Sequence, residues 1–197
     1  MTSSALTRWR DERKARLDEL LSIHAVVGGQ GPGRRWRTNQ LNRSLMLLLA
    51  AEFQGFAREL HDLSASTFAS WAAPGNQVLE QVIKGRLTEN RQLDRGNAQP
   101  GSLGSDYLRF GCSLWPGLAA SEPATVACQQ DLDKLNDARN AIAHADEAKL
   151  AGLRGEGYPL TLATFRQWRR SLDLLAVTMD AEVASHLGQL FGQPAPW

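Results

Sequence analysis

The sequence predicts an all-α protein, built as an antiparallel bundle of four or five helices. Apolar residues recur at helical spacing through several long segments, and no segment alternates polar and apolar residues as a half-buried strand does. A chain of 197 residues with 43% hydrophobic content can bury one sizeable core. We therefore expect a single compact unit, with an N-terminal helix and basic loop over residues 1–38 and a helical domain over residues 39–197.

Three helices are expected in the N-terminal half. Leucines and a tryptophan recur among charged residues over 5–23 and predict the first helix. The segment GGQGPGRRWR (28–37) predicts a loop, because glycine and proline interrupt helices. Residues 39–64 predict the longest helix, with a stripe of Leu41, Leu45, Leu48, Leu49, Phe56 and Leu63. Residues 76–87 predict a shorter helix, which follows a Pro-Gly turn.

Two more long helices and one short helix are expected in the C-terminal half. Residues 88–122 are rich in Gly, Pro, Ser and Asn, and predict a long loop with one short helix near 103–110. Residues 123–146 predict the next helix, because Pro123 suits a first helical turn. The segment AGLRGEGYP (151–159) predicts a break before a last long helix over 160–191.

Positive charge is concentrated near the N-terminus. The chain has a net charge of only +1, but residues 1–43 hold nine Lys or Arg against four Asp or Glu. Such a region could contact a polyanion, or it could form a solvated helix face followed by a basic loop. Within the loop, Arg34, Arg35, Trp36 and Arg37 could bind RNA through phosphate contacts and base stacking, or Trp36 could simply anchor a surface loop.

Composition gives no sign of a metal, cofactor or membrane. Cys112 and Cys128 form neither a disulfide framework nor a CxxC unit, which favours a reducing cytoplasm. The four histidines lie far apart, without the spacing of metal ligands. The N-terminus lacks the apolar core of a signal peptide, and the apolar run over 45–51 is too short to span a membrane. We expect a cytoplasmic protein with no metal, no cofactor and no membrane partner.

Two charged residues fall on helix faces that should be buried. On a helical wheel at about 100° per residue, Arg139 lies in the apolar stripe that Leu132, Leu135 and Ile142 form on the helix over 123–146. Glu52 lies at the centre of the apolar stripe of the helix over 39–64. A buried charge must be paired or must line a cleft. We expect either a structural Arg139–Glu52 pair or a polar pocket in which Glu52 orients Arg139 or His144.

A polar stripe beside Arg139 carries a known pattern. Asn140 and His144 stand one turn apart on it and can contact each other. The stretch LNDARNAIAHAD (135–146) resembles the signature of HEPN domains, in which four to six residues separate an arginine from a histidine. Here four residues separate Arg139 from His144, and the first of them is Asn140. LNRSLMLLLAAEFQGFARELH (41–61) resembles the helix of RiboL-PSP-type HEPN proteins that carries an inward acidic residue, here Glu52.

The resemblance covers about residues 40–190 and implies a HEPN-like bundle of four or five helices, often a homodimer whose motifs meet at a cleft. Active members are metal-independent endoribonucleases, and many act in toxin–antitoxin or anti-phage systems with a partner protein. Others have lost catalysis and serve as binding or assembly modules. Some HEPN toxins carry a tyrosine two residues after the histidine, which an antitoxin modifies with AMP. Asp146 occupies that position, so this modification is not expected.

These residue types suit RNA cleavage without a metal. The RNA 2′-hydroxyl attacks the adjacent phosphorus, which leaves a 2′,3′-cyclic phosphate. Histidine can transfer the protons because its unperturbed pKa is about 6.5. Arginine can stabilise the negatively charged transition state, and Asn140 could hold the imidazole or the phosphate.

The helical wheel of residues 123–146 also predicts that two copies of the chain assemble. On a continuous helix Arg139 and His144 point about 140° apart, so one helix does not easily direct both at one phosphate. Two copies related by a twofold axis can, and the alanines at 138, 141, 143 and 145 would let two helices approach closely. We expect a homodimeric HEPN-type ribonuclease that acts on RNA as a toxin or defence effector. The alternative is a catalytically inactive helical module that binds a partner protein or nucleotide.

Overall fold

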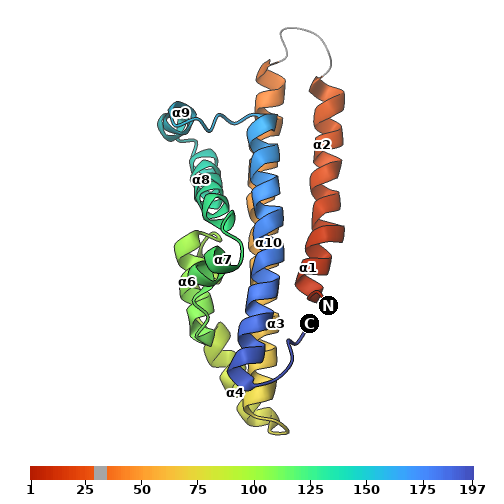
Figure 1. Cartoon of the computed structure of the whole chain (residues 1–197). Helices are drawn as coiled ribbons and strands as arrows, with labels where there is room; N and C mark the ends of the chain where they lie inside the picture. The colour runs from red at the N-terminus through yellow and green to blue at the C-terminus, as the bar shows by residue number, and fades with distance from the viewer. Residues whose placement is uncertain (29–34) are drawn as a thin grey trace.

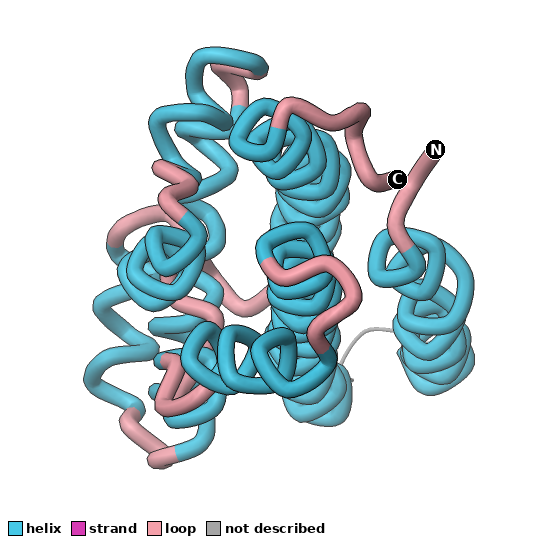
Figure 2. Tube along the Cα trace, turned by 90° about the horizontal axis from the view of Figure 1, so that it is seen from below, coloured by secondary structure: helices cyan, strands magenta, loops and turns pink. Residues whose placement is uncertain are grey.

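The computed structural model describes residues 1–28 and 35–197, except for the side chains of residues 28 and 35–37. Every element in these ranges is helical, which confirms the predicted all-α class. Figure 2 accordingly shows only helices and loops. The RNA contacts predicted for Arg34, Arg35, Trp36 and Arg37 fall outside the described residues.

Two long helices, α3 (Arg35–Ala72) and α10 (Leu162–Phe191), form the centre of the molecule. They pack against each other and run in the same direction (Figure 1). The N-terminal helices run antiparallel to α3 as one continuous rod that consists of α1 (Ser4–Arg8), a π-helical turn η1 (Trp9–Arg13) and α2 (Lys14–Gly28). The prediction of a purely antiparallel bundle is therefore wrong for the α3–α10 pair.

Because α3 and α10 are parallel, the chain between them must return along the whole bundle. Figure 1 shows this return path on the face opposite α1 and α2. It consists of α4 (Gln77–Thr88), α5 (Gln92–Arg95), α6 (Pro100–Tyr107), the 3₁₀ turn η2 (Leu108–Phe110), α7 (Leu114–Ser121), α8 (Thr125–Ala143) and α9 (Glu147–Gly155). The loop predicted over 88–122 is largely helical. The break predicted over 151–159 starts later, because α9 continues to Gly155, and it extends to the start of α10 at Leu162.

The helices within 88–122 are short and depend on tertiary contacts. Pro100 stands in the first turn of α6, where its missing N–H costs nothing. The carboxylate of Asp106 accepts hydrogen bonds from the backbone N–H groups of Gln92 and Leu93 at 2.9 and 2.8 Å, which stabilises the start of α5. A proline in a first turn and a carboxylate from another helix leave no apolar periodicity in the sequence. The composition of the segment therefore indicated a loop.

The helix α8 was predicted to end at residue 146, but it ends at Ala143. Ala145 takes a left-handed conformation with φ 53°, and the N–H of Asp146 donates to the carbonyl of Ala141 at 2.8 Å. This is the hydrogen bond of a Schellman motif, which usually contains glycine at the left-handed position. An alanine there is strained by roughly 1 kcal/mol. The motif leaves His144 as the C-cap of α8.

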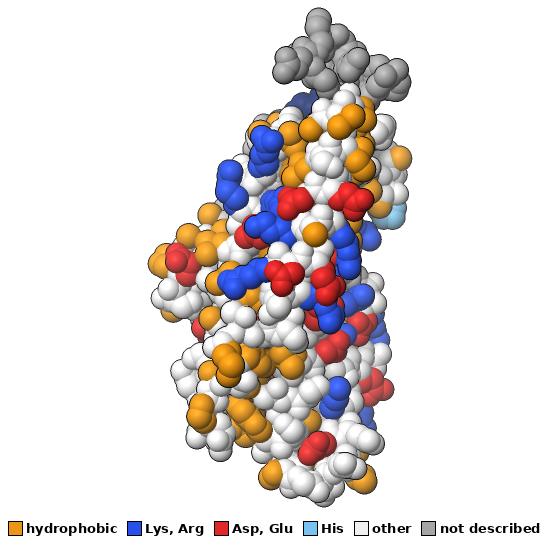
Figure 3. All heavy atoms as spheres, turned by 90° about the vertical axis from the view of Figure 1, so that its right-hand side faces the viewer, with side chains coloured by type: hydrophobic (Ala, Val, Ile, Leu, Met, Phe, Trp, Pro, Cys, Tyr) orange, Lys and Arg blue, Asp and Glu red, His pale blue; other side chains and the backbone are white. Residues whose placement is uncertain are grey.

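The excess of positive charge near the N-terminus is partly neutralised within the fold. Acidic and basic side chains alternate along the face formed by α1, η1 and α2 (Figure 3). Arg8 and Arg13 pair with Glu59 at 2.9 and 2.6 Å, and Arg13 and Arg16 pair with Glu52 at 2.7 and 3.0 Å. This face therefore has mixed charge and is a poor surface for a polyanion.

Candidate functional site

Arg139 and Asn140 lie side by side on the C-terminal part of α8. Both side chains are half-buried, and Arg139 donates from Nη1 to Oδ1 of Asn140 at 3.2 Å. The same oxygen accepts a 2.7 Å hydrogen bond from the side-chain amide of Asn97, in the connection between α5 and α6. Nearby on α8, Asn136 donates to the backbone carbonyl of Ala98 at 3.0 Å. Two asparagines thus fasten this connection to α8 beside Arg139.

These residues border a polar hollow of about 350 Å³, called here the Arg139 hollow. It is lined by Gln92, Arg95, Gly96, Asn97, Gln99, Ser102, Arg139 and Asn140. This lining brings together two arginines, several amides and a hydroxyl, and contains no carboxylate. Such a donor-rich lining suits an anion, because guanidinium and amide N–H groups match phosphate or carboxylate oxygens.

Arg95 is a site residue that the sequence did not suggest. It belongs to the four-residue helix α5, inside the segment that was expected to be a loop. Its guanidinium donates to Oδ1 of Asn90 at 2.6 Å, which holds the exposed side chain at the rim of the hollow. No pattern in the sequence pairs Arg95 with Arg139, because the two are brought together only by the return path of the chain.

His144 is exposed and lies beyond the Arg139 hollow. Its backbone N–H donates to the carbonyl of Asn140 at 3.0 Å, but its side chain forms no hydrogen bond with any residue that the structure describes. No hydrogen bond joins the side chains of Asn140 and His144 in the described structure; the Asn140 oxygen instead accepts from Asn97 and Arg139. Within one copy of the chain, Arg139 therefore contacts Asn140, whereas the His144 side chain lies apart from both at the end of α8.

The buried stripe of α8 is centred beside Arg139 rather than on it. Leu135, Ala138 and Ala141 face the core, where α8 packs against α3 and α10. Arg139 occupies the edge of this stripe, where it can reach the hollow. Two of the alanines that were expected to face a second copy, Ala138 and Ala141, are thus used inside the protein's own core.

The predicted contact between Glu52 and the Arg139 site is also wrong. Glu52 is only 6% exposed, as expected, but its carboxylate binds Arg13 at 2.7 Å and Arg16 at 3.0 Å. The Arg13 guanidinium lies directly against the backbone of Gly55, where any Cβ atom would overlap it. The π-helical turn η1 and this glycine together create the buried position of Arg13, so Glu52 is the structural partner of the N-terminal rod.

A second buried network supports the short helix α5. His61 is fully buried on α3. Its Nδ1 accepts a 3.1 Å hydrogen bond from Arg91, and its Nε2–H donates to the carbonyl of Asp106 at 3.2 Å. Arg91 also binds Asp62 at 2.6 Å and Asp94 at 2.8 Å. Burial, aided by the charge of Arg91, lowers the pKa of His61 to about 4. This neutral histidine helps to fix the segment that carries Arg95 and Asn97.

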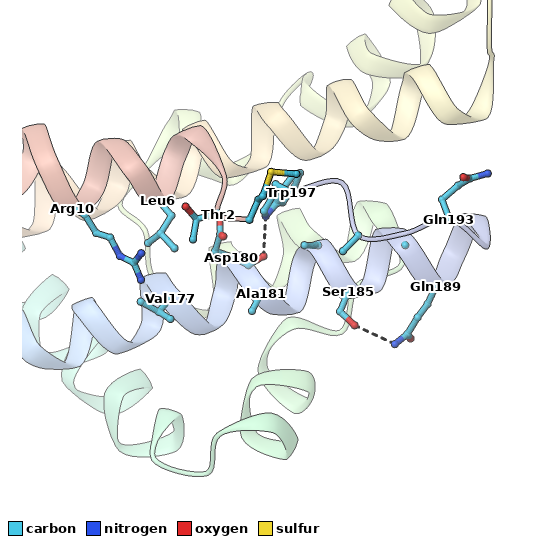
Figure 4. A pocket seen from close by; sticks show the side chains of 14 residues that line it. Thr2, Leu6, Arg10, Val177, Asp180, Ala181, Ser185, Gln189, Gln193 and Trp197 are labelled. Atoms are coloured by element: carbon cyan, nitrogen blue, oxygen red, sulfur yellow. Dashed lines mark hydrogen bonds between the residues drawn. The ribbon is translucent and has the colours of Figure 1, made fainter.

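Another hollow, of about 500 Å³, lies between α1, α10 and the C-terminal residues (Figure 4). Its buried carboxylate, Asp180, accepts the backbone N–H of Ser3 at 3.2 Å, and Trp197 donates to the Asp180 backbone carbonyl at 3.2 Å. Burial raises the pKa of Asp180. These contacts tie the first helix and the last residue to α10, so Asp180 has a structural role.

In the part of the chain that the structure describes, no three His, Cys, Asp or Glu side chains cluster as metal ligands would. None of the described helices combines the length and the apolar character needed to cross a membrane. No known protein family, curated protein or solved structure matches this chain.

Proposed function

We propose that this protein is a metal-independent endoribonuclease of the HEPN type, acting in the cytoplasm as a toxin or anti-phage effector. One observation carries the proposal. Arg139 and Asn140 line a hollow rich in hydrogen-bond donors, and His144 stands exposed at the end of the same helix. The spacing of the three residues resembles the HEPN signature, and the all-helical fold agrees with that resemblance.

The three residues would divide the chemistry among them. A phosphodiester of the RNA binds in the Arg139 hollow, where Arg139 stabilises the charge that develops on phosphorus. His144 removes the proton of the 2′-hydroxyl, and the oxygen forms a bond to phosphorus. The bond to the 5′-oxygen breaks, and that oxygen leaves with a proton from solvent. Asn140 does not hold the imidazole in this scheme; it orients the Arg139 guanidinium through their 3.2 Å hydrogen bond.

We propose further that the complete site forms between two copies of the chain. His144 does not line the hollow of its own chain, and an exposed C-cap residue is free to approach a second molecule. Exposed Ala143 and Ala145 flank it and present little bulk. In a twofold dimer, the His144 of one copy would then serve the Arg139 hollow of the other.

Mixing two inactive variants tests this shared site. Arg139→Ala and His144→Ala should each lower the cleavage rate by roughly a hundredfold or more. After unfolding and refolding together, about half of the dimers are mixed, and each mixed dimer has one intact site. Activity should then recover to about a quarter of the wild-type value. A mixture as inactive as its two components would contradict the shared site.

A specific feature also favours the second candidate function, a non-catalytic module that binds a partner protein. Val78, Leu79 and Val82 form an exposed apolar face on α4, with 74%, 44% and 55% of their surfaces accessible. Such a face is typical of a protein contact. A catalytically inert protein that binds a partner and loses it on Val78→Asp and Val82→Asp substitution would favour this candidate. An active nuclease could use the same face for its antitoxin.

A further inference from the structure

A second polar hollow, of about 660 Å³, lies where α3, α9 and the segment before α10 meet. It is lined by Thr38, Asn39, Asn42, Arg43, Leu150, Arg154, Pro159, Leu160 and Thr161. Both charged residues in this lining are arginines, Arg43 on α3 and Arg154 on α9. We call it the Arg43–Arg154 hollow. Its volume falls in the range of small-molecule binding sites.

The walls of this hollow are fixed by hydrogen bonds from three parts of the chain. The side chain of Asn42 accepts from His24 on α2 at 2.9 Å and donates to the backbone carbonyl of Leu160 at 3.1 Å. The hydroxyl of Thr164 donates to the carbonyl of Pro159 at 2.6 Å. The segment before α10 is therefore held in place without a ligand, and a ligand would meet a preformed surface.

The two arginines differ in how well they are already paired. Arg43 binds the carboxylate of Glu147 at 2.9 Å, but its buried Nε has no hydrogen-bond partner among the residues that the structure describes. Arg154 forms no ion pair within the described chain. Glu147 is 67% exposed, so its attraction for Arg43 is weakened by water. The hollow thus keeps a net positive charge for an incoming anion.

The lining also indicates the kind of anion. Two guanidinium groups and the amide of Asn39 suit the several oxygens of a phosphate. Leu150, Pro159 and Leu160 supply an apolar surface beside them, against which a sugar or base could pack. A phosphate ester satisfies both halves of the lining better than an inorganic ion does.

The hollow is close in sequence to the proposed catalytic histidine. His144 is the C-cap of α8, and α9, which carries Arg154, begins at Glu147. We propose that the Arg43–Arg154 hollow binds a phosphodiester of the RNA substrate on one side of the cleaved bond. This inference rests on the proposed function, since it takes the ligand to be the nuclease's own substrate.

Binding of an uncleavable RNA tests the inference separately from catalysis. A fluorescent oligonucleotide with 2′-O-methyl riboses lacks the nucleophile, so anisotropy reports binding alone. Arg154→Ala should raise the Kd by about tenfold and reduce the slope of log Kd against log salt by about one. Glu147→Gln should lower the Kd severalfold, because it releases Arg43 from its carboxylate. If the Arg43–Glu147 pair were only structural, breaking it would not tighten RNA binding.

Arg86→Ala is the matched control. Arg86 is an exposed arginine on α4, a helix at the opposite end of the molecule from α9, so its removal should leave the Kd unchanged. Unchanged binding in both Arg154→Ala and Glu147→Gln would overturn the inference. AMP binding that depends on Arg154, combined with RNA binding that does not, would assign the hollow to a free nucleotide and would also overturn it. Absence of RNA cleavage by the wild type would refute the proposed function without changing this binding result.

Discussion

Asn97 donates a 2.7 Å hydrogen bond to the side-chain oxygen of Asn140 and so joins the connection between α5 and α6 to α8. Arg139 donates to the same oxygen at 3.2 Å. Two donors on one carbonyl oxygen use both of its lone pairs and fix the orientation of the amide. Asn97 thereby acts on Arg139 through Asn140, although it lies 43 positions from Asn140 in the sequence.

Asn97 should therefore position Arg139, the arginine proposed to act in catalysis. We expect Asn97→Ala to lower kcat/KM for RNA cleavage by about tenfold, because Asn140 loses one of its two donors. Asn97→Asp should lower it further, since a carboxylate in the Arg139 hollow repels phosphate. Circular dichroism should show both variants folded. Cleavage by Asn97→Ala at the wild-type rate would mean that Asn140 holds Arg139 unaided.

The Glu52–Arg13 pair should affect stability rather than catalysis. Glu52→Ala leaves Glu59 as the remaining acidic partner of the buried Arg13. We therefore expect the free energy of unfolding to fall by about 2–3 kcal/mol. Cleavage per folded molecule should stay unchanged, because Glu52 contacts the N-terminal rod and not the Arg139 hollow. Urea unfolding measures the first effect, and an assay at low temperature measures the second.

A surface acid provides the comparison for Glu52. Glu12 is 61% exposed and meets Arg8 and Arg16 only at 3.8 and 3.9 Å. Its replacement by alanine should cost less than about 0.5 kcal/mol. Equal losses for Glu12→Ala and Glu52→Ala would show that the buried pair has no special energetic role.

His61 should make the fold sensitive to mild acid. Its pKa is lowered to about 4 in the folded protein by burial and Arg91, against about 6.5 when unfolded. Between these values the unfolded state binds a proton that the folded state does not, so stability falls as the pH decreases from about 6.5 towards 4. The full effect is roughly 3 kcal/mol.

A glutamine at position 61 isolates this contribution. Its amide can accept from Arg91 and donate to the Asp106 carbonyl but cannot titrate. Between pH 7 and pH 4.5, wild type should lose roughly 2–3 kcal/mol more stability in urea unfolding than His61→Gln does. Parallel stability curves for the two proteins would show that His61 is protonated equally well in both states.

The long helices could be predicted because each carries its own apolar stripe. Residues 39–64 and 160–191 were expected to be helical, and α3 (Arg35–Ala72) and α10 (Leu162–Phe191) contain almost all of these positions. The parallel orientation of these two helices could not be predicted, since it depends on how the intervening chain returns. Short helices such as α5 escaped prediction because the Asp106 carboxylate that supports α5 comes from α6.

The candidate site was only partly predictable for the same reason. Local spacing was enough to single out Arg139, Asn140 and His144 on one helix end. The partner of Glu52 depends on the η1 turn and on Gly55, and neither leaves a signal on a helical wheel. Asn97 and Arg95 approach α8 only through tertiary folding. Their roles followed from the hydrogen bonds and the lining of the hollow.

Cleavage of RNA in EDTA by wild type and by His144→Ala tests the proposed activity most directly. Wild type should cut and leave a 2′,3′-cyclic phosphate, and a 2′-deoxy substitution at the cut position should block cleavage there. His144→Ala should be slower by roughly a hundredfold or more, with unchanged folding. The control Arg86→Ala should cleave at the wild-type rate. Cleavage that requires an added metal ion, or that proceeds equally fast in His144→Ala, would contradict the proposed mechanism.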